Sequence, residues 1–432
     1  MLERFFQLEA HGTTVRKEII AGITTFLTMA YIIVVNPDIL SVAGMDYGAV
    51  FVATCVAAAV GSLIMGLWAN YPIALAPGMG LNAFFSFAVV QGMGYTWQVA
   101  LGAVFLSGLI FFTLSVFKVR EWIINSIPHG LRFGISAGIG FFLALIALKN
   151  AQIVVDNPAT LVGLGDITAP ETLLTFAGFL LICALAYLRV TGAVMIGIIA
   201  VTIVAMLLGM VEYNGLVSAP PSVAPTFMQL DIAGALDVSL VSIVFAFLFV
   251  DLFDTSGTLI GAAQRGGLLD ENGKLPRLGK ALMADGVATM TGAVAGTSTT
   301  TSYIESTAGI TAGGRTGLTA VVVALLFLLS LFFAPIASIV PAYATAPALL
   351  YVSVLMTSGL KLIDWDDVTE AAPAVITALM MPLTFSIANG IALGFITYAL
   401  LKAVSGRWSS LNVSVVCIAV MFILKFMFLD VQ

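Results

Sequence analysis

Charged residues are scarce in this sequence. Asp, Glu, Lys and Arg make up only 9% of the 432 residues, while 60% are hydrophobic and the mean hydropathy is +1.09. A soluble domain carries about 25% charged residues, so the composition excludes a soluble globular protein. It predicts a polytopic membrane protein whose main partner is the lipid bilayer. With so few charges present, the formal net charge of -6 indicates nothing specific about other partners.

Cysteine and histidine are also rare. The three cysteines, Cys55, Cys183 and Cys417, lie far apart in apolar runs without the spacing of a metal or redox site, so we interpret them as small buried hydrophobes. The two histidines, His11 and His129, lie in polar flanks and suggest neither a zinc site nor a histidine-based triad. We therefore expect no cofactor, no metal and no enzymatic activity.

Long apolar runs are abundant. A helix needs about 20 apolar residues to span a bilayer, and fewer where it is buried in a bundle. Fourteen segments qualify, near residues 19–37, 48–69, 80–91, 97–117, 130–148, 171–188, 192–211, 238–262, 281–296, 302–312, 316–339, 344–360, 368–386 and 388–403. A further run, 411–429, could be a last span or a helix packed along the bundle. Residues 1–18 lack the apolar core and cleavage site of a signal peptide, so we expect the first span to remain in the mature protein.

The basic residues predict the orientation of these spans. With a cytoplasmic N-terminus, the inner loops collect fifteen of the seventeen Lys and Arg residues, as the positive-inside rule requires. Lys149 breaks the pattern, and the side of Lys425 depends on the last segment. The long outer loop 212–237 contains no Lys or Arg. We therefore expect an even number of core spans and both ends of this core on the cytoplasmic side.

Two of the fourteen segments are unsuited to be simple spans. Residues 71–85 are extended and interrupted by proline until Gly80, and residues 296–314 begin in a run of Thr and Ser. We expect a short strand before each of these broken segments, which are the third and the tenth. Interrupted segments at corresponding places in two halves are typical of secondary transporters built from inverted repeats. Irregular backbone at this depth must line a cavity or be buried in protein, so the two should face each other.

This pattern predicts an all-α polytopic membrane protein with a 7+7 inverted repeat. The first repeat covers residues 1–211 and the second covers residues 238–403. The outer loop 212–237 connects them, and residues 404–432 form a C-terminal hydrophobic segment.

Four acidic residues lie at membrane depth: Asp251, Asp254, Asp285 and Glu305. Each costs ~2.5–3.5 kcal/mol at a helix centre on insertion scales, so a function is the natural explanation. Asp251 and Asp254 share one helix face. Glu305 lies at the start of a half-helix, where free N–H groups and the helix dipole favour negative charge. Any of these acids could instead be a protonated hydrogen-bonding group in helix packing, and Asp285 could lie near the inner surface.

Other candidate site residues are polar or aromatic. Asn82 is an amide in an apolar helix directly after the PGMG motif, and its side chain can both donate and accept hydrogen bonds. Thr301 and Ser302 belong to a hydroxyl-rich run, although such hydroxyls commonly bond back to helix carbonyls. Phe84 and Phe85 could stack on a flat ligand, although phenylalanines in membrane proteins usually serve packing alone.

Four stretches of the sequence together resemble one family. They are EAHGTTVRKEIIAGITTFLTMAYIIVVNPDIL, ALAPGMGLNAFFSF, LFDTSGTLIGAA and GTSTTTSYIESTAGITAGGRTGLTAVVVALLFL. From about Phe5 to the C-terminus the chain resembles the AzgA-like branch of the nucleobase–cation symporters, the adenine/guanine/hypoxanthine permeases. The resemblance implies a core domain (about 19–117 and 238–339) and a gate domain (about 128–211 and 340–403). It also implies proton-coupled import of a purine base held between the two half-helices.

The resemblance assigns roles to individual residues. The family's third-segment amide falls on Asn82, its eighth-segment acid on Asp254 and its tenth-segment acid on Glu305. Asp251 stands where relatives can carry Asn, which puts an obligatory ionised role in doubt. The more distant uracil and xanthine carriers can have His where this chain has Thr258. A histidine relay is therefore absent there, and Asp254 and Glu305 would have to exchange the coupling proton.

The sequence therefore predicts a purine nucleobase:proton symporter of the cell inner membrane, with elevator-like or rocking motion of the core against the gate. Hypoxanthine and guanine are favoured over adenine on family likeness only. The alternatives are a sulfate-type anion transporter of the same fold, which two acids in the site disfavour, and a non-transporting receptor. No nucleic-acid partner is expected. The sequence leaves the oligomeric state open, including a homodimer.

Overall fold

The computed structural model describes residues 2–117, 128–213, 215–237, 240–270 and 275–428. In the first half of the chain the elements are α1 (Leu2–Phe6), α2 (Val15–Met29), α3 (Ile32–Ser41), α4 (Tyr47–Ile64), the π-helix η1 (Met65–Ala69), β1 (Leu75–Pro77), α5 (Met79–Ala83), the π-helix η2 (Phe84–Gly92), α6 (Trp97–Val116), α8 (His129–Asn150), β2 (Val154–Asn157), β3 (Leu161–Leu164), α9 (Pro170–Tyr187) and α10 (Ala193–Leu207). In the second half they are α11 (Ile232–Ala235), α12 (Val241–Gly266), α13 (Leu278–Ala295), β4 (Thr300–Ser302), α14 (Ser306–Thr311), α15 (Gly317–Ser330), α16 (Ala334–Ser338), α17 (Ala342–Thr357), α18 (Val368–Leu383), α19 (Ile387–Val404) and α20 (Val413–Phe428), with short 3-10 turns at Leu331–Phe333, Ser358–Leu362 and Trp408–Ser410.

The fold is mostly helical, as the composition predicts. Among the described residues, nine helices are long and apolar enough to cross a membrane, and four more apolar helices are shorter, among them α20. A helix lies at each of the fourteen expected segments. Two of these helices count neither as spans nor among the shorter apolar helices, one because of its composition and the other because of its length. They are α13, which is rich in Gly, Ala and Thr, and α14, which is only six residues long. The expected outer loop after α8 also contains a β2–β3 hairpin that the sequence analysis did not predict.

The two expected short strands are present and pair with each other. β1 and β4 are antiparallel, with Ala76 opposite Thr301 at the centre of the register. Backbone hydrogen bonds extend the pairing at both ends, from Gly78 N to Thr299 O (2.9 Å) and from Tyr303 N to Ala74 O (3.0 Å). The two broken segments therefore meet as one small sheet, although more than 200 residues separate them in the sequence.

Side chains of neighbouring helices form hydrogen bonds with the backbone groups on the outer edges of this sheet. On β1, Leu75 N donates to the Ser62 hydroxyl of α4 (3.0 Å), and that hydroxyl donates to Leu75 O (3.2 Å). On β4, the Thr289 hydroxyl of α13 donates to Thr300 O (2.9 Å). A buried backbone group without a partner is costly, so these hydroxyls are needed for a sheet in this environment.

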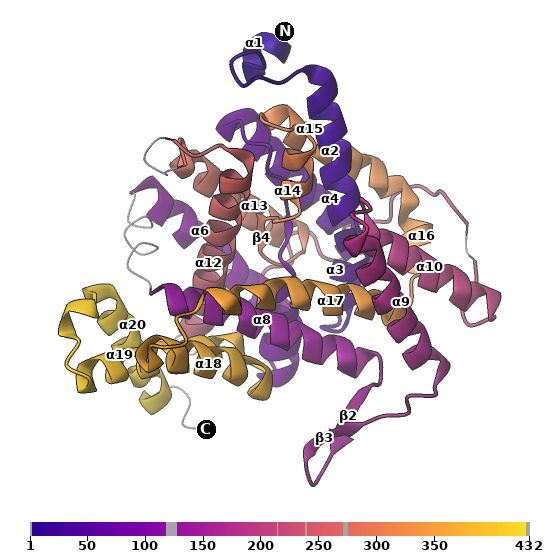
Figure 1. Cartoon of the computed structure of the whole chain (residues 1–432). Helices are drawn as coiled ribbons and strands as arrows, with labels where there is room; N and C mark the ends of the chain where they lie inside the picture. The colour runs from indigo at the N-terminus through magenta and orange to yellow at the C-terminus, as the bar shows by residue number, and fades with distance from the viewer. Residues whose placement is uncertain (1, 118–127, 214, 238–239, 271–274, 429–432) are drawn as a thin grey trace.

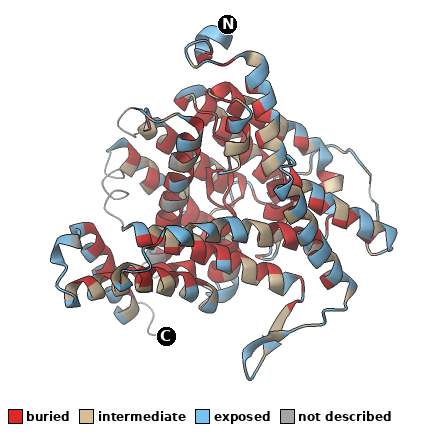
Figure 2. Ribbon diagram, in the orientation of Figure 1, coloured by how far each residue is buried: buried red, intermediate tan, exposed pale blue. Residues whose placement is uncertain are grey.

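The helices form two packed groups with a broken segment between them. In one group α2, α4, α6, α13 and α15 contact one another; in the other, α8 lies beside α17 and α18, which in turn contact α9 and α19 (Figure 1). Buried residues concentrate in the interior, while the outer faces of α2, α9 and α10 carry exposed apolar side chains (Figure 2). Exposed apolar faces of this kind are what contact with lipid requires.

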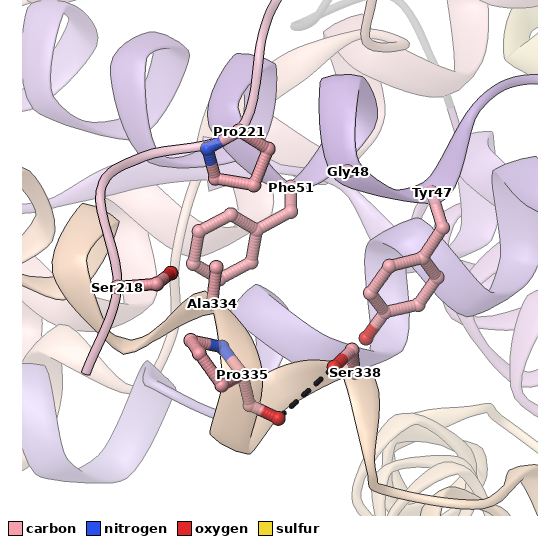
Figure 3. Close-up of a pocket in the computed structure, with 8 residues that line it drawn as sticks. All are labelled: Tyr47, Gly48, Phe51, Ser218, Pro221, Ala334, Pro335 and Ser338. Atoms are coloured by element: carbon pink, nitrogen blue, oxygen red, sulfur yellow. Dashed lines mark hydrogen bonds between the residues drawn. The ribbon is translucent and has the colours of Figure 1, made fainter. Parts of the chain in front are cut away.

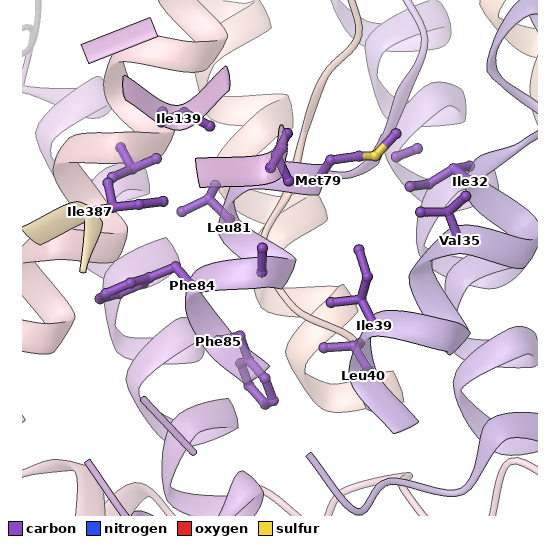
Figure 4. Packing of buried hydrophobic residues seen from close by; sticks show 14 of the residues in the cluster. Ile32, Val35, Ile39, Leu40, Met79, Leu81, Phe84, Phe85, Ile139 and Ile387 are labelled. Atoms are coloured by element: carbon purple, nitrogen blue, oxygen red, sulfur yellow. The ribbon is translucent and has the colours of Figure 1, made fainter. Parts of the chain in front are cut away.

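The broken segment α5–η2 links the two groups through apolar contacts. Its residues Met79, Leu81 and Phe85 lie between α3 on one side and Ile139 of α8 on the other (Figure 4). The approach to α8 is close, because a Cβ atom on Gly80 would lie 2.5 Å from Ile139 Cγ2. Only glycine fits at this position.

A buried carboxylate joins α2 to the start of α15. Glu18 is fully buried, and its Oε1 accepts a hydrogen bond from Arg315 N (2.8 Å). Its Oε2 accepts from Thr316 N (3.3 Å), from Thr319 N (3.2 Å) and from the Thr319 hydroxyl (2.6 Å). The negative charge thus lies at the helix N-terminus, where free N–H groups and the dipole stabilise it.

We expect Glu18→Ala to destabilise the protein, because it leaves several buried donors without an acceptor. Hydrogen bonds to charged groups contribute ~1.5–3 kcal/mol, so the melting temperature of the purified protein in detergent should fall clearly. Glu9→Ala, which changes an exposed acid of the same N-terminal region, is the control. Equal melting temperatures for the two variants would contradict this role of Glu18.

Candidate functional site

Asp254 and Glu305 both lie next to the small sheet. Asp254 lies on α12, Glu305 directly precedes α14, and both are only partly buried. Asp254 Oδ2 lies 3.8 Å from the position that a Cβ atom on Gly78 would take. The same Cβ atom would lie 2.7 Å from Thr301 Cγ2, so glycine is required where β1 passes β4 and turns into α5.

Glu305 is held by the break between α2 and α3. The Tyr31 hydroxyl donates to Glu305 Oε1 (2.5 Å). The Thr28 hydroxyl of α2 lies 3.4 Å from the Glu305 backbone oxygen but has a closer acceptor in Thr25 O (2.7 Å). The sequence analysis did not identify Tyr31 as a site residue. The available signal was a phenol in an otherwise apolar run, within TMAYIIVV, where α2 ends and α3 begins.

Asn82 presents a free donor. Its side chain is fully buried on α5, and its Oδ1 accepts a hydrogen bond from the Ser298 hydroxyl. In the part of the chain that the structure describes, its Nδ2 has no hydrogen-bond partner. An unpaired buried N–H group costs about 1–3 kcal/mol, which is consistent with a group kept for a ligand. Ser298 is a second residue that the sequence analysis did not identify.

The remaining polar candidates form a cluster behind β4. The Thr255 hydroxyl lies 3.3 Å from Asp251 Oδ1, 2.9 Å from Asp285 Oδ1 and 2.6 Å from Thr301 Oγ1. Asp285 Oδ1 also accepts a hydrogen bond from Ser302 N (3.1 Å).

None of these side chains is more than 2% exposed. The structure therefore places Asp251, Thr301 and Ser302 in a buried hydrogen-bond network that supports the strand β4. Asp285 is fully buried within the protein, and its role in the network is to hold the edge of β4.

Phe84 lies in the hydrophobic core. Its ring is fully buried and packs edge-to-face against Phe247 of α12, with 5.0 Å between the ring centroids. In Figure 4 its side chain extends toward Ile387. The ring therefore offers no open face for stacking in this structure.

A separate cavity of about 310 Å³ shares no residue with this site. It is lined mainly by apolar groups, including Phe51, Pro221 and Pro335 (Figure 3). Two of its hydroxyls are used within the protein, since Ser338 donates to Pro335 O (3.0 Å) and Tyr47 donates to Ala337 O (2.8 Å). We assign no ligand to it.

Residues 16–393 match the model of a family described as the permease family. The chain is 54% identical to the adenine permease AdeP of Escherichia coli (strain K12), across 100% of this chain and 97% of that protein. It is 47% identical to the guanine/hypoxanthine permease PbuG of Bacillus subtilis (strain 168), across 99% of this chain and 100% of that protein.

Two solved structures share the fold at low identity. The transmembrane domain of a cyanobacterial bicarbonate transporter, BicA, superposes with a TM-score of 0.66 at 16% identity, covering 86% of this chain and 96% of that one. The murine anion transporter Slc26a9 gives a TM-score of 0.65 at 11% identity, covering 90% and 68%.

The Thr255 hydroxyl allows a test of the supporting network. Thr255→Val keeps the shape of the side chain but removes the hydroxyl that the two buried carboxylates share, so we expect a loss of about 1–3 kcal/mol. The melting temperature in detergent should therefore fall more than for Thr202→Val, a buried threonine whose hydroxyl donates to Ile198 O of its own helix. The same shift for both variants would contradict the network.

Proposed function

The chain belongs to the permease family, whose members are membrane transporters rather than enzymes, and from this we propose that it carries purine nucleobases across the membrane. The observation that carries the proposal is the placement of two partly buried carboxylates and an amide donor around one small sheet. Asp254 lies beside Gly78 at the end of β1, Asn82 follows on α5, and Glu305 follows β4 at the other end of the sheet.

The chemistry of the site suits a purine. A purine has a planar face and an edge on which N–H donors alternate with N or C=O acceptors. Ionised Asp254 and Glu305 can accept hydrogen bonds from ring N–H groups, and Asn82 Nδ2 can donate to a ring nitrogen or carbonyl. A site that satisfies hydrogen bonds in this way rejects analogues that leave its groups unpaired.

The choice among the three bases rests on the relatives. The likeness seen in the sequence favours hypoxanthine and guanine. However, the adenine permease is the more identical of the two relatives described above. We therefore propose the purine class as substrate, with adenine tested on equal terms with hypoxanthine and guanine.

For the mechanism we propose proton symport by a 7+7 inverted repeat in the cell inner membrane, with a cytoplasmic N-terminus. Asp254 or Glu305 would exchange the proton, and the core domain (about 19–117 and 238–339) would move against the gate domain (about 128–211 and 340–403). The separate packing of the two helix groups supports this division. The matching roles of α4 and α13, each of which satisfies the outer edge of one strand, support the repeat.

A sulfate-type anion transporter is the competing proposal, because the solved structures of similar fold include anion transporters. Fold similarity does not determine the substrate. Two carboxylates that face one site would repel an anion, so the chemistry of Asp254 and Glu305 favours a base. Unlabelled sulfate should leave uptake of labelled hypoxanthine and adenine unchanged, whereas unlabelled purines should reduce it.

We expect Asp254→Asn and Glu305→Gln to impair uptake of labelled purines. Each change removes a charge-assisted hydrogen bond, which is worth ~1.5–3 kcal/mol, or roughly 10- to 100-fold in affinity. Uptake is measured in cells that lack their own purine permeases and in proteoliposomes with an imposed pH gradient. In the variant that lacks the proton-exchanging acid, purine uptake should also no longer increase with the imposed pH gradient.

Glu212→Gln, which changes an exposed acid outside the site, is the matched control and should behave like the wild type. Wild-type rates and pH dependence in both site variants would contradict the mechanism. Proteoliposomes that accumulate no purine with an imposed gradient would contradict proton-coupled transport, and a receptor would then be the better explanation.

A further inference from the structure

We propose that Tyr31 is a positioning residue for base recognition: its hydroxyl fixes the Glu305 carboxylate so that the second carboxylate oxygen faces the ligand. The inference rests on the proposed function, because it assumes that Glu305 contacts the base. Tyr31 stands between α2 and α3, is 1% exposed and donates to Glu305 Oε1 at 2.5 Å.

The contact gives the site a fixed acceptor. A carboxylate has two oxygens that can accept hydrogen bonds, and Tyr31 occupies Oε1. A Glu side chain has several rotatable bonds, and ordering it on ligand binding would cost conformational entropy. A carboxylate that is already held in place avoids part of this cost, so the benefit of the hydroxyl should appear as affinity for the base.

Glu305 has little support from its own helix. It occupies the N-cap position of α14, and its side chain makes no capping hydrogen bond there. Its carboxylate is contacted instead from the α2–α3 break, by the Tyr31 hydroxyl. The orientation of the carboxylate is thus set by a segment 274 residues away in the sequence.

A purely structural role makes a different prediction. A buried phenol needs a hydrogen-bond partner, and Glu305 could simply satisfy it. In that case Tyr31→Phe, which keeps the ring and its packing, would change stability but not affinity. If Tyr31 acts through Glu305, the loss of affinity should disappear once Glu305 has been replaced.

Tyr303 is a matched control. It is also a buried tyrosine beside the site, but its hydroxyl donates to the Pro77 backbone oxygen (2.6 Å) rather than to a carboxylate. Tyr303→Phe should therefore change binding by the same factor whether or not Glu305 is present.

The experiment is a double-mutant cycle on the full chain in lipid nanodiscs, with labelled adenine and labelled hypoxanthine as probes. We expect Tyr31→Phe to raise Kd roughly tenfold, as for the loss of a hydrogen bond to a charged group. It should also raise KM in proteoliposomes and leave the maximal rate close to that of the wild type. In the Glu305→Gln background, Tyr31→Phe should change Kd by less than about twofold, since coupled residues are not additive.

Three outcomes would overturn the inference. They are an unchanged Kd, the same increase of Kd in both backgrounds, and loss of the folded protein on removal of this one hydroxyl, which would show a structural role. If the wild type binds neither probe, the proposed function itself is wrong and the inference falls with it. If the wild type binds purine but Tyr31→Phe and Glu305→Gln change Kd independently of each other, only the proposed role of Tyr31 is wrong.

Discussion

The site depends on one constraint, which is that extended backbone surrounded by apolar protein and lipid must find its hydrogen bonds within the protein. β1 and β4 satisfy their facing edges by pairing with each other, and Ser62 and Thr289 serve the outer edges. Each strand is three residues long and is followed closely by a helix. Because the strands are antiparallel, α5 and α14 start at opposite ends of the same small sheet, which places Asn82 at one end and Glu305 at the other.

The acids in the apolar interior divide into two kinds by their surroundings. Glu18 and Asp285 are fully buried and accept hydrogen bonds from backbone N–H groups, so their charge serves the fold. Asp254 and Glu305 are only partly buried and lie beside the small sheet. A buried charge is tolerated where the protein supplies its hydrogen bonds. Depth alone therefore does not mark a functional acid: Glu18 and Asp285 are fully buried beside backbone N–H donors, whereas Asp254 and Glu305 keep part of their surface exposed.

The contacts around α5 have a bearing on the proposed motion. The surfaces that meet between α5 and α8 are hydrocarbon, and their packing is non-directional. Hydrocarbon surfaces can slide over each other with little loss of free energy, unlike directional hydrogen bonds. Glu305, in contrast, is held by Tyr31 through such a directional bond, within the helix group that contains α2.

The sequence by itself determined the membrane class, the places of the helices, the two strands before the broken segments and the resemblance to the permease family. These features follow from local signals, namely apolar runs, interruptions by Gly and Pro, and hydroxyl-rich stretches. Only the tertiary structure decided that Tyr31 holds Glu305, that Ser298 orients Asn82 and that Asp251 lies behind the strand. These contacts join residues up to 274 positions apart. Hydrogen bonds depend on distance and angle, which no local pattern encodes, whereas burial of apolar surface depends mainly on composition and periodicity.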